Sequence, residues 1–358
     1  MSPKRSGWRF NSAVRVADRW IGQGHPCFVI AEAGSNHNRS LPLALKLIDV
    51  AAKAASDAVK FQSFIPHKIY VKNAGCADYL GHSRTIQEIF EKIQMPREWL
   101  PKLARHCKRK RILFLSSVFD PESADQVDPF VPAHKIASYE CTHLPLIRHV
   151  ARKGKPILLS TGMASLREIG DALETIAAAG NRNVVLMHCI AKYPAPVDVS
   201  NLRVIETLRQ EFRVPVGLSD HSRDALVNPV ATVARGGNIL EKHFTLKNTL
   251  PGPDHRFAVE PKELARMVEA VRNAEAALGS SVKKVHRLEK ELYLFARRRV
   301  HAIADIRRGD VFTVENVAVL RSGKARPGLE PRHFDRILGK RAKTNIRESD
   351  GIRSEDVY

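Results

Sequence analysis

Eight short apolar runs recur along the first 280 residues and alternate with longer amphipathic segments. The runs have the length and the branched aliphatic side chains of buried strands, whereas the segments between them have the three-to-four-residue spacing of helices. In chain order the runs are CFVIAE, DAVKFQ, ILFLSS, AHKIAS, PILLST, NVVLMH, PVGLSD and NILEKH. Regular alternation of this kind is typical of an α/β fold, and a count of eight predicts a closed (β/α)8 TIM barrel. An open doubly wound sheet is the alternative.

The turn after the first run argues against the open sheet. It reads AEAGSNHN and lacks the G-x-G-x-x-G pattern with which such sheets bind dinucleotides. The chain also has no G-x-x-x-x-G-K-[ST] loop for nucleotide phosphates. A nucleotide cofactor is therefore not expected.

Polar side chains stand at the carboxyl end of every apolar run. In a barrel these ends meet at one rim, which is where TIM-barrel active sites lie. The rim residues are Glu32, Lys60, Gln62, Ser116, Ser117, Lys135, Ser138, Ser160, Thr161, His188, His221 and His243. Two imidazoles from neighbouring strands, His221 and His243, can bind a divalent metal, and lysine with serine suits phosphate and carboxylate groups. The ring predicts a small phosphorylated acid that reacts with a carbonyl compound polarised by the metal.

The chain is strongly basic, with 58 lysines and arginines against 38 acidic residues and a net charge of +20. Such a charge attracts polyanions. However, aromatic residues make up only 6%, and the basic runs at 108–111 and 297–299 are short, so the pattern of a nucleic-acid-binding module is missing. We expect no specific nucleic acid partner. A non-catalytic polyanion-binding protein is the distant alternative, which the charge favours and the polar rim disfavours.

The chain contains no apolar run of about 18 residues, the length that a membrane span requires. The start, MSPKRSGWRF, lacks the apolar stretch of a secretory signal. We therefore expect a cytoplasmic protein without a membrane partner.

Near residue 280 the alternation of apolar runs and amphipathic segments ends, and a charged stretch follows. We assign residues 1–280 to the barrel, the charged stretch 281–295 to a linker, and residues 296–358 to a small β-rich domain. The last segment contains a weak internal echo, IRRGDVFTVENV at 306–317 and IRESDGIRSEDV at 346–357.

Several motifs follow one another as they do in the sialic acid (N-acetylneuraminate) synthase family. They are AEAGSNHN, AVKFQ, KIASYE, GKPILLSTGM, HCIAKYPAP, GLSDH, ILEKHFT and PGPD. The chain resembles this family, which includes legionaminic and pseudaminic acid synthases, over nearly its whole length. The stretch HAIADIRRGDVFTVENVAVLR resembles the antifreeze-like SAF domain, a β-clip fold, that these synthases carry behind the barrel.

The resemblance implies a transferase of the EC 2.5.1 type. It would condense phosphoenolpyruvate with an N-acyl hexosamine such as N-acetylmannosamine, and with water, to a nine-carbon 2-keto acid and phosphate, by C–O cleavage. The cofactor implied is Mn²⁺, with Mg²⁺ or Co²⁺ as alternatives.

The resemblance also implies roles for individual residues. Phosphoenolpyruvate would be held by Lys60, Lys135, Ser117, Ser138 and Ser160. The sugar would be held by Glu32, Gln62, Tyr193 and Asp254. The metal would be held by His221 and His243, and Glu140 would take a proton from the attacking water, so that Glu32, Glu140, Lys60 and Lys135 form the catalytic set. Arg321 would complete the sugar site of the partner subunit in a homodimer with swapped SAF domains.

The chain departs from the family pattern at Ala191, where relatives often have Asn or Ser, and at Arg297, where some have an apolar residue. The loss of an amide and the gain of a cation point to a different hexosamine. A legionaminic or pseudaminic acid synthase acting on a 2,4-diacetamido-6-deoxyhexose is the first alternative. A metal-dependent aldolase barrel acting on a phosphorylated sugar is another.

Overall fold

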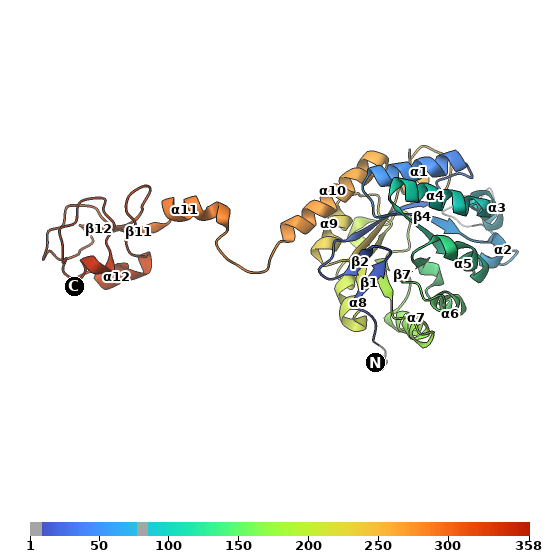
Figure 1. The fold of residues 1–358 in the computed structure, drawn as a ribbon, viewed down its shortest axis with the longest axis horizontal. Helices are drawn as coiled ribbons and strands as arrows, with labels where there is room; N and C mark the ends of the chain where they lie inside the picture. Colours follow the sequence, from blue (N-terminus) through green and yellow to red (C-terminus); the bar gives the residue numbers. More distant parts are fainter. Residues whose placement is uncertain (1–8, 77–84) are drawn as a thin grey trace. The chain divides into compact units, whose positions relative to one another are not determined.

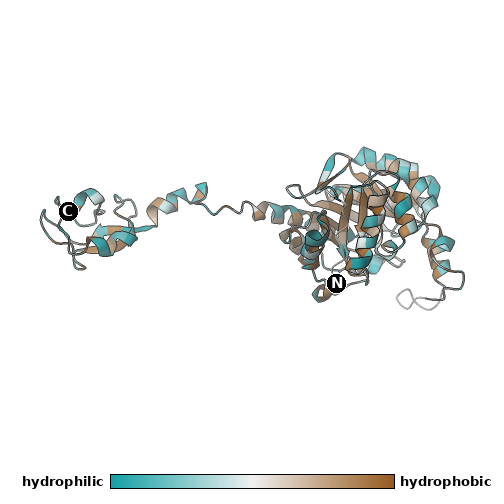
Figure 2. Ribbon diagram, turned by 90° about the horizontal axis from the view of Figure 1, so that it is seen from below, coloured by the Kyte–Doolittle hydropathy of each residue, from teal (hydrophilic) through white to brown (hydrophobic). Residues whose placement is uncertain are grey.

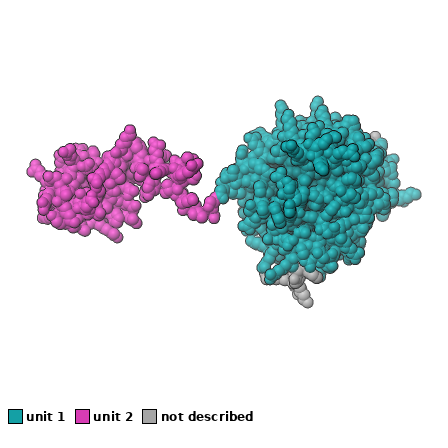
Figure 3. All heavy atoms as spheres, viewed as in Figure 1, with its two compact units in different colours: residues 1–279 teal, residues 280–358 magenta. Residues whose placement is uncertain are grey.

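The computed structural model describes residues 9–76 and 85–358. The chain divides into two compact units, residues 1–279 and 280–358 (Figure 3). Unit 1 contains the eight apolar runs, and unit 2 contains the C-terminal β-rich segment. Among the described residues, none of the helices combines the length and the apolar character needed to cross a membrane.

Eight parallel strands close into a barrel in unit 1, in the order β10-β3-β4-β5-β6-β7-β8-β9, with helices around it (Figure 1). The barrel strands are β3 (Phe28–Gly34), β4 (Ala58–Ser63), β5 (Leu113–Val118), β6 (His134–Ile136), β7 (Ile157–Ser160), β8 (Val184–Cys189), β9 (Val216–Asp220) and β10 (Ile239–His243). Each predicted apolar run forms one of them. The prediction of a TIM barrel is confirmed, and the open sheet is excluded.

Helices cover the outside of the barrel. They are α1 (Leu41–Lys53), α2 (Pro66–Ile69), α3 (Ile86–Ile93), α4 (Leu100–Lys110), α5 (Pro121–Val127), α6 (Leu144–Ala151), α7 (Leu166–Ala178), α8 (Val204–Phe212), α9 (Val227–Ala234) and α10 (Pro261–Leu278). Local sequence explains where they begin. In α7, for example, the hydroxyl of Ser165 caps the backbone of Glu168, and the Glu168 carboxylate caps the backbone of Ser165.

The strands alternate between two apolar layers, as the two-residue period of a strand requires. Outward side chains such as Val29 and Val59 pack against the helices, and inward side chains such as Ile30, Leu158 and Met187 fill the barrel. Figure 2 shows the strands as predominantly hydrophobic and the helices as mixed. Inward positions near the carboxyl ends of the strands are polar instead, so the barrel interior changes from apolar to polar along its axis.

A two-stranded hairpin precedes the barrel, formed by β1 (Ala13–Val16) and β2 (Arg19–Gly22). The sequence analysis did not predict it. Its side chains Val14, Val16 and Ile21 are fully buried and belong to the same apolar cluster as the inward side chains of the strands. The hairpin therefore closes the amino end of the barrel.

Unit 2 contains an antiparallel pair, β11 (Arg298–Ala302) and β12 (Val317–Arg321), together with isolated bridges and the short helix α12 (Phe334–Ile337). Its small core includes Val300, Phe312 and Ile352. The two halves of the internal echo pair with each other, because Ile306 and Ile346 exchange two backbone hydrogen bonds of 2.8 Å. A helix, α11 (Lys290–Phe295), lies within the stretch that we assigned to a linker.

Candidate active site

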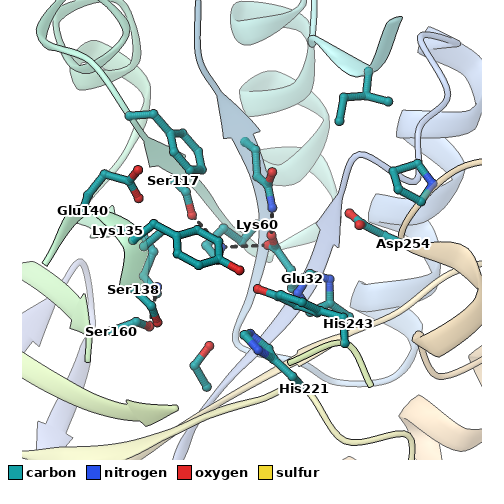
Figure 4. A pocket seen from close by; sticks show the side chains of 18 of the residues that line it. Glu32, Lys60, Ser117, Lys135, Ser138, Glu140, Ser160, His221, His243 and Asp254 are labelled. Carbon is teal, nitrogen blue, oxygen red and sulfur yellow. Dashed lines mark hydrogen bonds and ion pairs between the residues drawn. The ribbon is translucent and has the colours of Figure 1, made fainter. Parts of the chain in front are cut away.

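A cavity of about 410 Å³ lies at the carboxyl ends of the barrel strands. Twelve of the rim and motif residues that we predicted for the barrel site line it. These are Glu32, Lys60, Gln62, Ser117, Lys135, Ser138, Glu140, Ser160, Tyr193, His221, His243 and Asp254. Figure 4 shows the serines, Lys135 and Glu140 on one side, the two histidines and Asp254 on the other, and Glu32 with Lys60 between them.

Two buried lysines make the floor of the cavity. The Lys60 ammonium donates a 2.7 Å hydrogen bond to the Ser117 hydroxyl, and the Lys135 amine donates a 2.7 Å bond to the Ser160 hydroxyl. The third serine, Ser138, accepts a 3.1 Å bond from the backbone N–H of Gly162. The two lysines, Ser117 and Ser160 come from the four neighbouring strands β4 to β7, and Ser138 follows β6. They converge because the inward positions of neighbouring strands lie side by side.

Two carboxylates balance the lysines. Lys60 lies 2.9 Å from Glu32 and 3.5 Å from Glu241, and Lys135 lies 3.9 Å from Glu241. Burial raises the pKa of Glu32 to about 7, against the opposing effect of Lys60. Burial acts on Glu241 in the same direction, but Lys135 and Lys60 outweigh it and lower the pKa of that carboxyl. The environments thus separate the two acids, so that Glu241 is the ionised one and Glu32 can hold a proton near neutral pH.

The two imidazoles lie together on adjacent strand ends, with ring centroids 5.6 Å apart. The Nδ1 of His221 is 2.9 Å from the Ile190 carbonyl, so it donates there and the lone pair is on Nε2, which has the Cys189 thiol at 3.7 Å. Burial lowers the pKa of His221 to about 4 and lowers that of His243 further below its usual range. Both rings are therefore neutral, which is the form that binds metals.

The site has unsatisfied polar atoms that a ligand would meet. Among the described residues, buried side-chain atoms without a hydrogen-bond partner include Nδ1 of His243, Oε2 of Glu140 and Oε2 of Glu241, all on this cavity. Buried polar atoms are normally paired, so three orphans in one cavity indicate a site built for a polar guest. In the described part of the chain, no group of three or more His, Cys, Asp and Glu side chains is arranged to hold a metal. The two neutral imidazoles would supply two of the ligands of a divalent ion.

Glu140 is buried on the same side of the cavity as Lys135. Burial raises the pKa of its carboxyl to about 8, with Lys135 opposing the shift. A carboxyl with a pKa near the working pH is suited to exchange a proton with a substrate or with water.

The predicted sugar residues also line the cavity. The Gln62 amide donates a 2.9 Å bond to Glu32, and the Asp254 carboxylate accepts a 2.9 Å bond from the Ser35 hydroxyl. Tyr193 stacks on His221 with a centroid separation of 4.0 Å. The turn beside Asp254 requires glycine at position 34, because φ is +51° there and an added Cβ would lie 2.9 Å from the Asp254 carboxylate.

Among the barrel-strand residues that line the cavity, the sequence analysis missed two, Ser219 and Glu241. Each stands two positions before a predicted histidine, on the same side of its strand, so the two-residue period would have found both. It also included three rim residues that do not line the cavity, Ser116, Thr161 and His188. The Thr161 hydroxyl donates to the Met187 carbonyl at 3.1 Å. The ring of His188 bonds the Ser200 carbonyl at 2.8 Å, and the Ser116 hydroxyl donates to the Ser63 hydroxyl. His188 and Ser116 belong to the layer between strands and helices.

The predicted residues of the small domain lie in unit 2 and are described only within it. Arg321 is exposed at the end of β12, beside a small hollow that it shares with His301 and Ser349. The Arg297 guanidinium lies 4.4 Å above the ring of Tyr293. In unit 1, Ala191 is not among the described residues that line the barrel cavity.

Comparison with known proteins gives a consistent assignment. The profile of the NeuB family matches residues 47–283, and the profile of the SAF domain matches residues 297–357. The spore coat polysaccharide biosynthesis protein SpsE of Bacillus subtilis is 41% identical, over 97% of this chain and 97% of its own length. Its crystal structure superposes with a TM-score of 0.67 and covers 97% of this chain and 99% of that one.

Two further proteins carry more specific names. The N,N'-diacetyllegionaminic acid synthase of Campylobacter jejuni is 36% identical, over 91% of this chain and 98% of its own. The structure of the N-acetylneuraminic acid synthetase of Leptospira borgpetersenii, in complex with citrate, has a TM-score of 0.72 at 30% identity and covers 80% of this chain and 96% of that one.

Proposed function

The chain belongs to the NeuB family, and from this membership we propose that it condenses phosphoenolpyruvate with an N-acyl hexosamine and water. The products are a nine-carbon 2-keto acid and inorganic phosphate. The observation that carries the proposal is the cavity, where two buried lysines bonded to serine hydroxyls stand next to two neutral imidazoles.

The lysine floor suits phosphoenolpyruvate. A bound phosphate and carboxylate would take the hydrogen bonds that Lys60 and Lys135 now give to Ser117 and Ser160, and the hydroxyls would turn to the same oxygens. Negative charge beside Lys135 would hold it protonated, against the lowering of its pKa by burial. The floor thereby fixes the enol with its third carbon free to attack.

The imidazole pair suits a divalent cation, for which Mn²⁺ is our first choice and Mg²⁺ or Co²⁺ the alternatives. Held by His221 and His243, the ion would supply Lewis-acid polarisation of the sugar's carbonyl group. Tyr193, stacked on His221, and the hydrogen bond to the Ile190 carbonyl would keep that imidazole in place. Glu32, Gln62 and Asp254 would orient the sugar hydroxyls.

The chain's acids would manage the protons. After carbon–carbon bond formation, water adds to the second carbon of the former enol, and phosphate leaves with its bridging oxygen. Glu140, whose pKa is raised to about 8, would accept the proton that this water loses.

The proposal is tested by incubating the full-length protein with Mn²⁺, phosphoenolpyruvate and a panel of free and phosphorylated hexosamines. We expect a nine-carbon acid, identified by mass spectrometry, from free N-acyl hexosamines. Phosphoenolpyruvate labelled with ¹⁸O in the bridging position should give labelled phosphate. The variant carrying both His221→Ala and His243→Ala should lose turnover at least about a thousandfold, roughly 4 kcal/mol of barrier.

Two outcomes would replace the proposal. Product from phosphorylated sugars alone would replace the free N-acyl hexosamine of the proposal with a phosphorylated sugar. A failure to consume phosphoenolpyruvate with any sugar, together with tight binding of an anionic polysaccharide that survives loss of both histidines, would favour a binding protein.

A further inference from the structure

Two of the sequence motifs form neighbouring loops that are joined by hydrogen bonds. The motif AEAGSNHN ends β3 and continues into the loop before α1, and PGPDH lies in the loop after β10. The proposed condensation uses only Glu32 and Asp254 of these motifs. The polar side chains of residues 35–38 and of His255 have no part in it.

His255 bridges the two loops. Its ring is buried, with Nδ1 2.6 Å from the Thr245 hydroxyl and Nε2 3.1 Å from the amide oxygen of Asn38. Burial lowers the pKa of His255 to about 4, so the ring is neutral and carries one proton. The Thr245 hydroxyl therefore donates to Nδ1, and Nε2 donates to Asn38. The ring thus ties the stretch after β10 to the loop after β3.

Two further hydrogen bonds join the same segments. The Ser35 hydroxyl donates a 2.9 Å bond to the Asp254 carboxylate, and the Asn36 amide donates a 2.8 Å bond to the carbonyl of Phe244. We name these two bonds, together with the two bonds of the His255 ring, the clasp. Buried hydrogen bonds of this kind restrict a loop to one arrangement.

The clasp fixes a segment that reaches the cavity. The described residues that line the cavity do not include His255, but they include Asp254 directly before it and Phe257 two residues after it. The Phe257 ring contacts the ring of His243, with 5.2 Å between the centroids. A group that orients a ligand works only when its supporting residues hold it in place.

We propose that His255 is a positioning residue, which holds the Asp254 carboxylate toward the sugar by tying residues 253–257 to the loop after β3. This inference rests on the proposed condensation, in which Asp254 orients the sugar. The two lysines that would hold phosphoenolpyruvate lie on β4 and β6, outside the clasp. Loss of the clasp should therefore weaken sugar binding much more than phosphoenolpyruvate binding.

The test uses the full-length protein, saturating Mn²⁺ and the hexosamine of the panel that gives the highest kcat/KM. His255→Phe keeps a ring at this position and removes both hydrogen bonds. We expect it to raise the KM for the sugar at least about fivefold and to leave the KM for phosphoenolpyruvate within about twofold of wild type. His255→Gln keeps a donor near the position of Nε2 and should have a sugar KM between those of the wild type and His255→Phe.

Asn38 allows a second variant that leaves the ring intact. Its φ is +46°, a value that glycine adopts readily, so Asn38→Gly removes the amide without straining the backbone. We expect Asn38→Gly to raise the KM for the sugar as well. The double variant of Asn38→Gly with His255→Phe should match His255→Phe alone, because Asn38 acts through the ring.

His106→Phe is the matched control. His106 is also buried, and its ring is hydrogen-bonded to Asp49 at 2.8 Å, but it lies in α4. The control variant should change neither KM, whatever its effect on the urea midpoint. Hydrogen exchange followed by mass spectrometry gives a readout that does not depend on turnover. The amides of residues 252–258 should exchange faster in His255→Phe than in the wild type, and at the wild-type rate in His106→Phe.

A folded His255→Phe protein with the wild-type KM for the sugar would overturn the inference and leave the proposed condensation intact. An equal rise in the KM values of both substrates would overturn it too, because a general loss of structure would then explain the effect. Absence of turnover of every sugar by the wild type would instead refute the condensation itself and, with it, this role of His255.

Discussion

Glu140 and Glu32 are two carboxyls of one cavity whose surroundings differ. Glu32 has an ammonium partner at 2.9 Å, whereas one oxygen of Glu140 has no hydrogen-bond partner among the described residues. Burial raises both pKa values, to about 7 and about 8. Unequal acids of this kind allow one residue to bind and the other to exchange protons.

We expect the Glu140→Gln variant to bind phosphoenolpyruvate and Mn²⁺ nearly as the wild type does, and to turn over at least about tenfold more slowly, roughly 1.4 kcal/mol of barrier. A base works in its deprotonated form, and the raised pKa of about 8 keeps Glu140 largely protonated at neutral pH. The wild-type kcat should therefore rise as pH increases through about 8, and the glutamine variant should lose this limb. The measurement is a pH profile of kcat from pH 6 to pH 10. A profile that survives the substitution would remove Glu140 from proton transfer.

At the residue scale, the sequence predicted most of the site, because strand ends in a barrel share one rim. It did not separate inward from outward side chains, and so it included His188 and omitted Glu241. Counting two residues back from each histidine would have corrected this. The environment of Glu140 was not predictable, because its pKa depends on burial that only the assembled fold creates.

An ion pair joins the outward sides of β9 and β10, directly behind the two imidazoles. Lys242 and Asp220 are paired in the strand register and 2.7 Å apart, and both side chains are almost completely buried. The same ammonium group donates a 2.7 Å bond to the Asp224 carbonyl. The pair therefore holds the chain on both sides of His221.

Replacing Lys242 with Met should leave the Asp220 carboxylate buried and uncompensated, which costs about 3–5 kcal/mol of stability. We expect a lower urea midpoint and, because the loop at His221 loses its anchor, weaker Mn²⁺ binding by calorimetry. The control is Lys68→Met, which removes an exposed pair with Glu122 and should leave the urea midpoint and the metal affinity close to wild type. Wild-type stability in the Lys242→Met protein would contradict this account.

Two glycines, one in a strand and one in a helix, are expected to respond oppositely to replacement by alanine. At Gly217 in β9, an added Cβ would lie 1.9 Å from the Ile239 carbonyl, whereas at Gly170 in α7 the nearest atom would be 3.9 Å away. We expect Gly217→Ala to destabilise the barrel severely, because two strands must move apart. Gly170→Ala should instead stabilise the protein by about 0.5–1 kcal/mol through helix propensity. The measurement is the free energy of unfolding of each variant from its denaturation curve. A Gly217→Ala protein as stable as the wild type would contradict the close packing of β9 on β10.

At the element scale, all eight strands followed from apolar periodicity, and the segments between them were expected to be helical. The hairpin of β1 and β2 did not, because each strand has only four residues and its burial depends on the barrel end that it covers. The helix within the expected linker, α11, was also missed, because it has only six residues and follows a charged stretch.

At the scale of the whole molecule, the chain has two units, each with its own core. Within unit 2, the stretch that leads to β11 exposes Leu288, Leu292 and Phe295. We propose that these side chains are covered in a homodimer, in which the SAF domain of one subunit brings Arg321 to the barrel of the other. Light scattering should report a dimer.

Cutting the chain after residue 285 should leave a folded barrel that binds phosphoenolpyruvate as before but has at least a tenfold higher KM for the sugar. Arg321→Ala in the full-length protein should also raise the KM for the sugar. The control is Arg308→Ala, elsewhere on unit 2, which should leave both KM values unchanged. Equal sugar affinity in the truncated barrel would show that unit 2 has no part in the site.

The side chains of Val14, Val16 and Ile21 close the amino end of the barrel. In the described part of the chain, access to the cavity is therefore from the carboxyl end. In the proposed reaction we expect phosphoenolpyruvate to reach the lysines before the sugar enters, and phosphate to leave after the nine-carbon acid. Steady-state kinetics should thus show an obligatory sequence with phosphoenolpyruvate as the leading substrate, and inorganic phosphate should inhibit by competing with it.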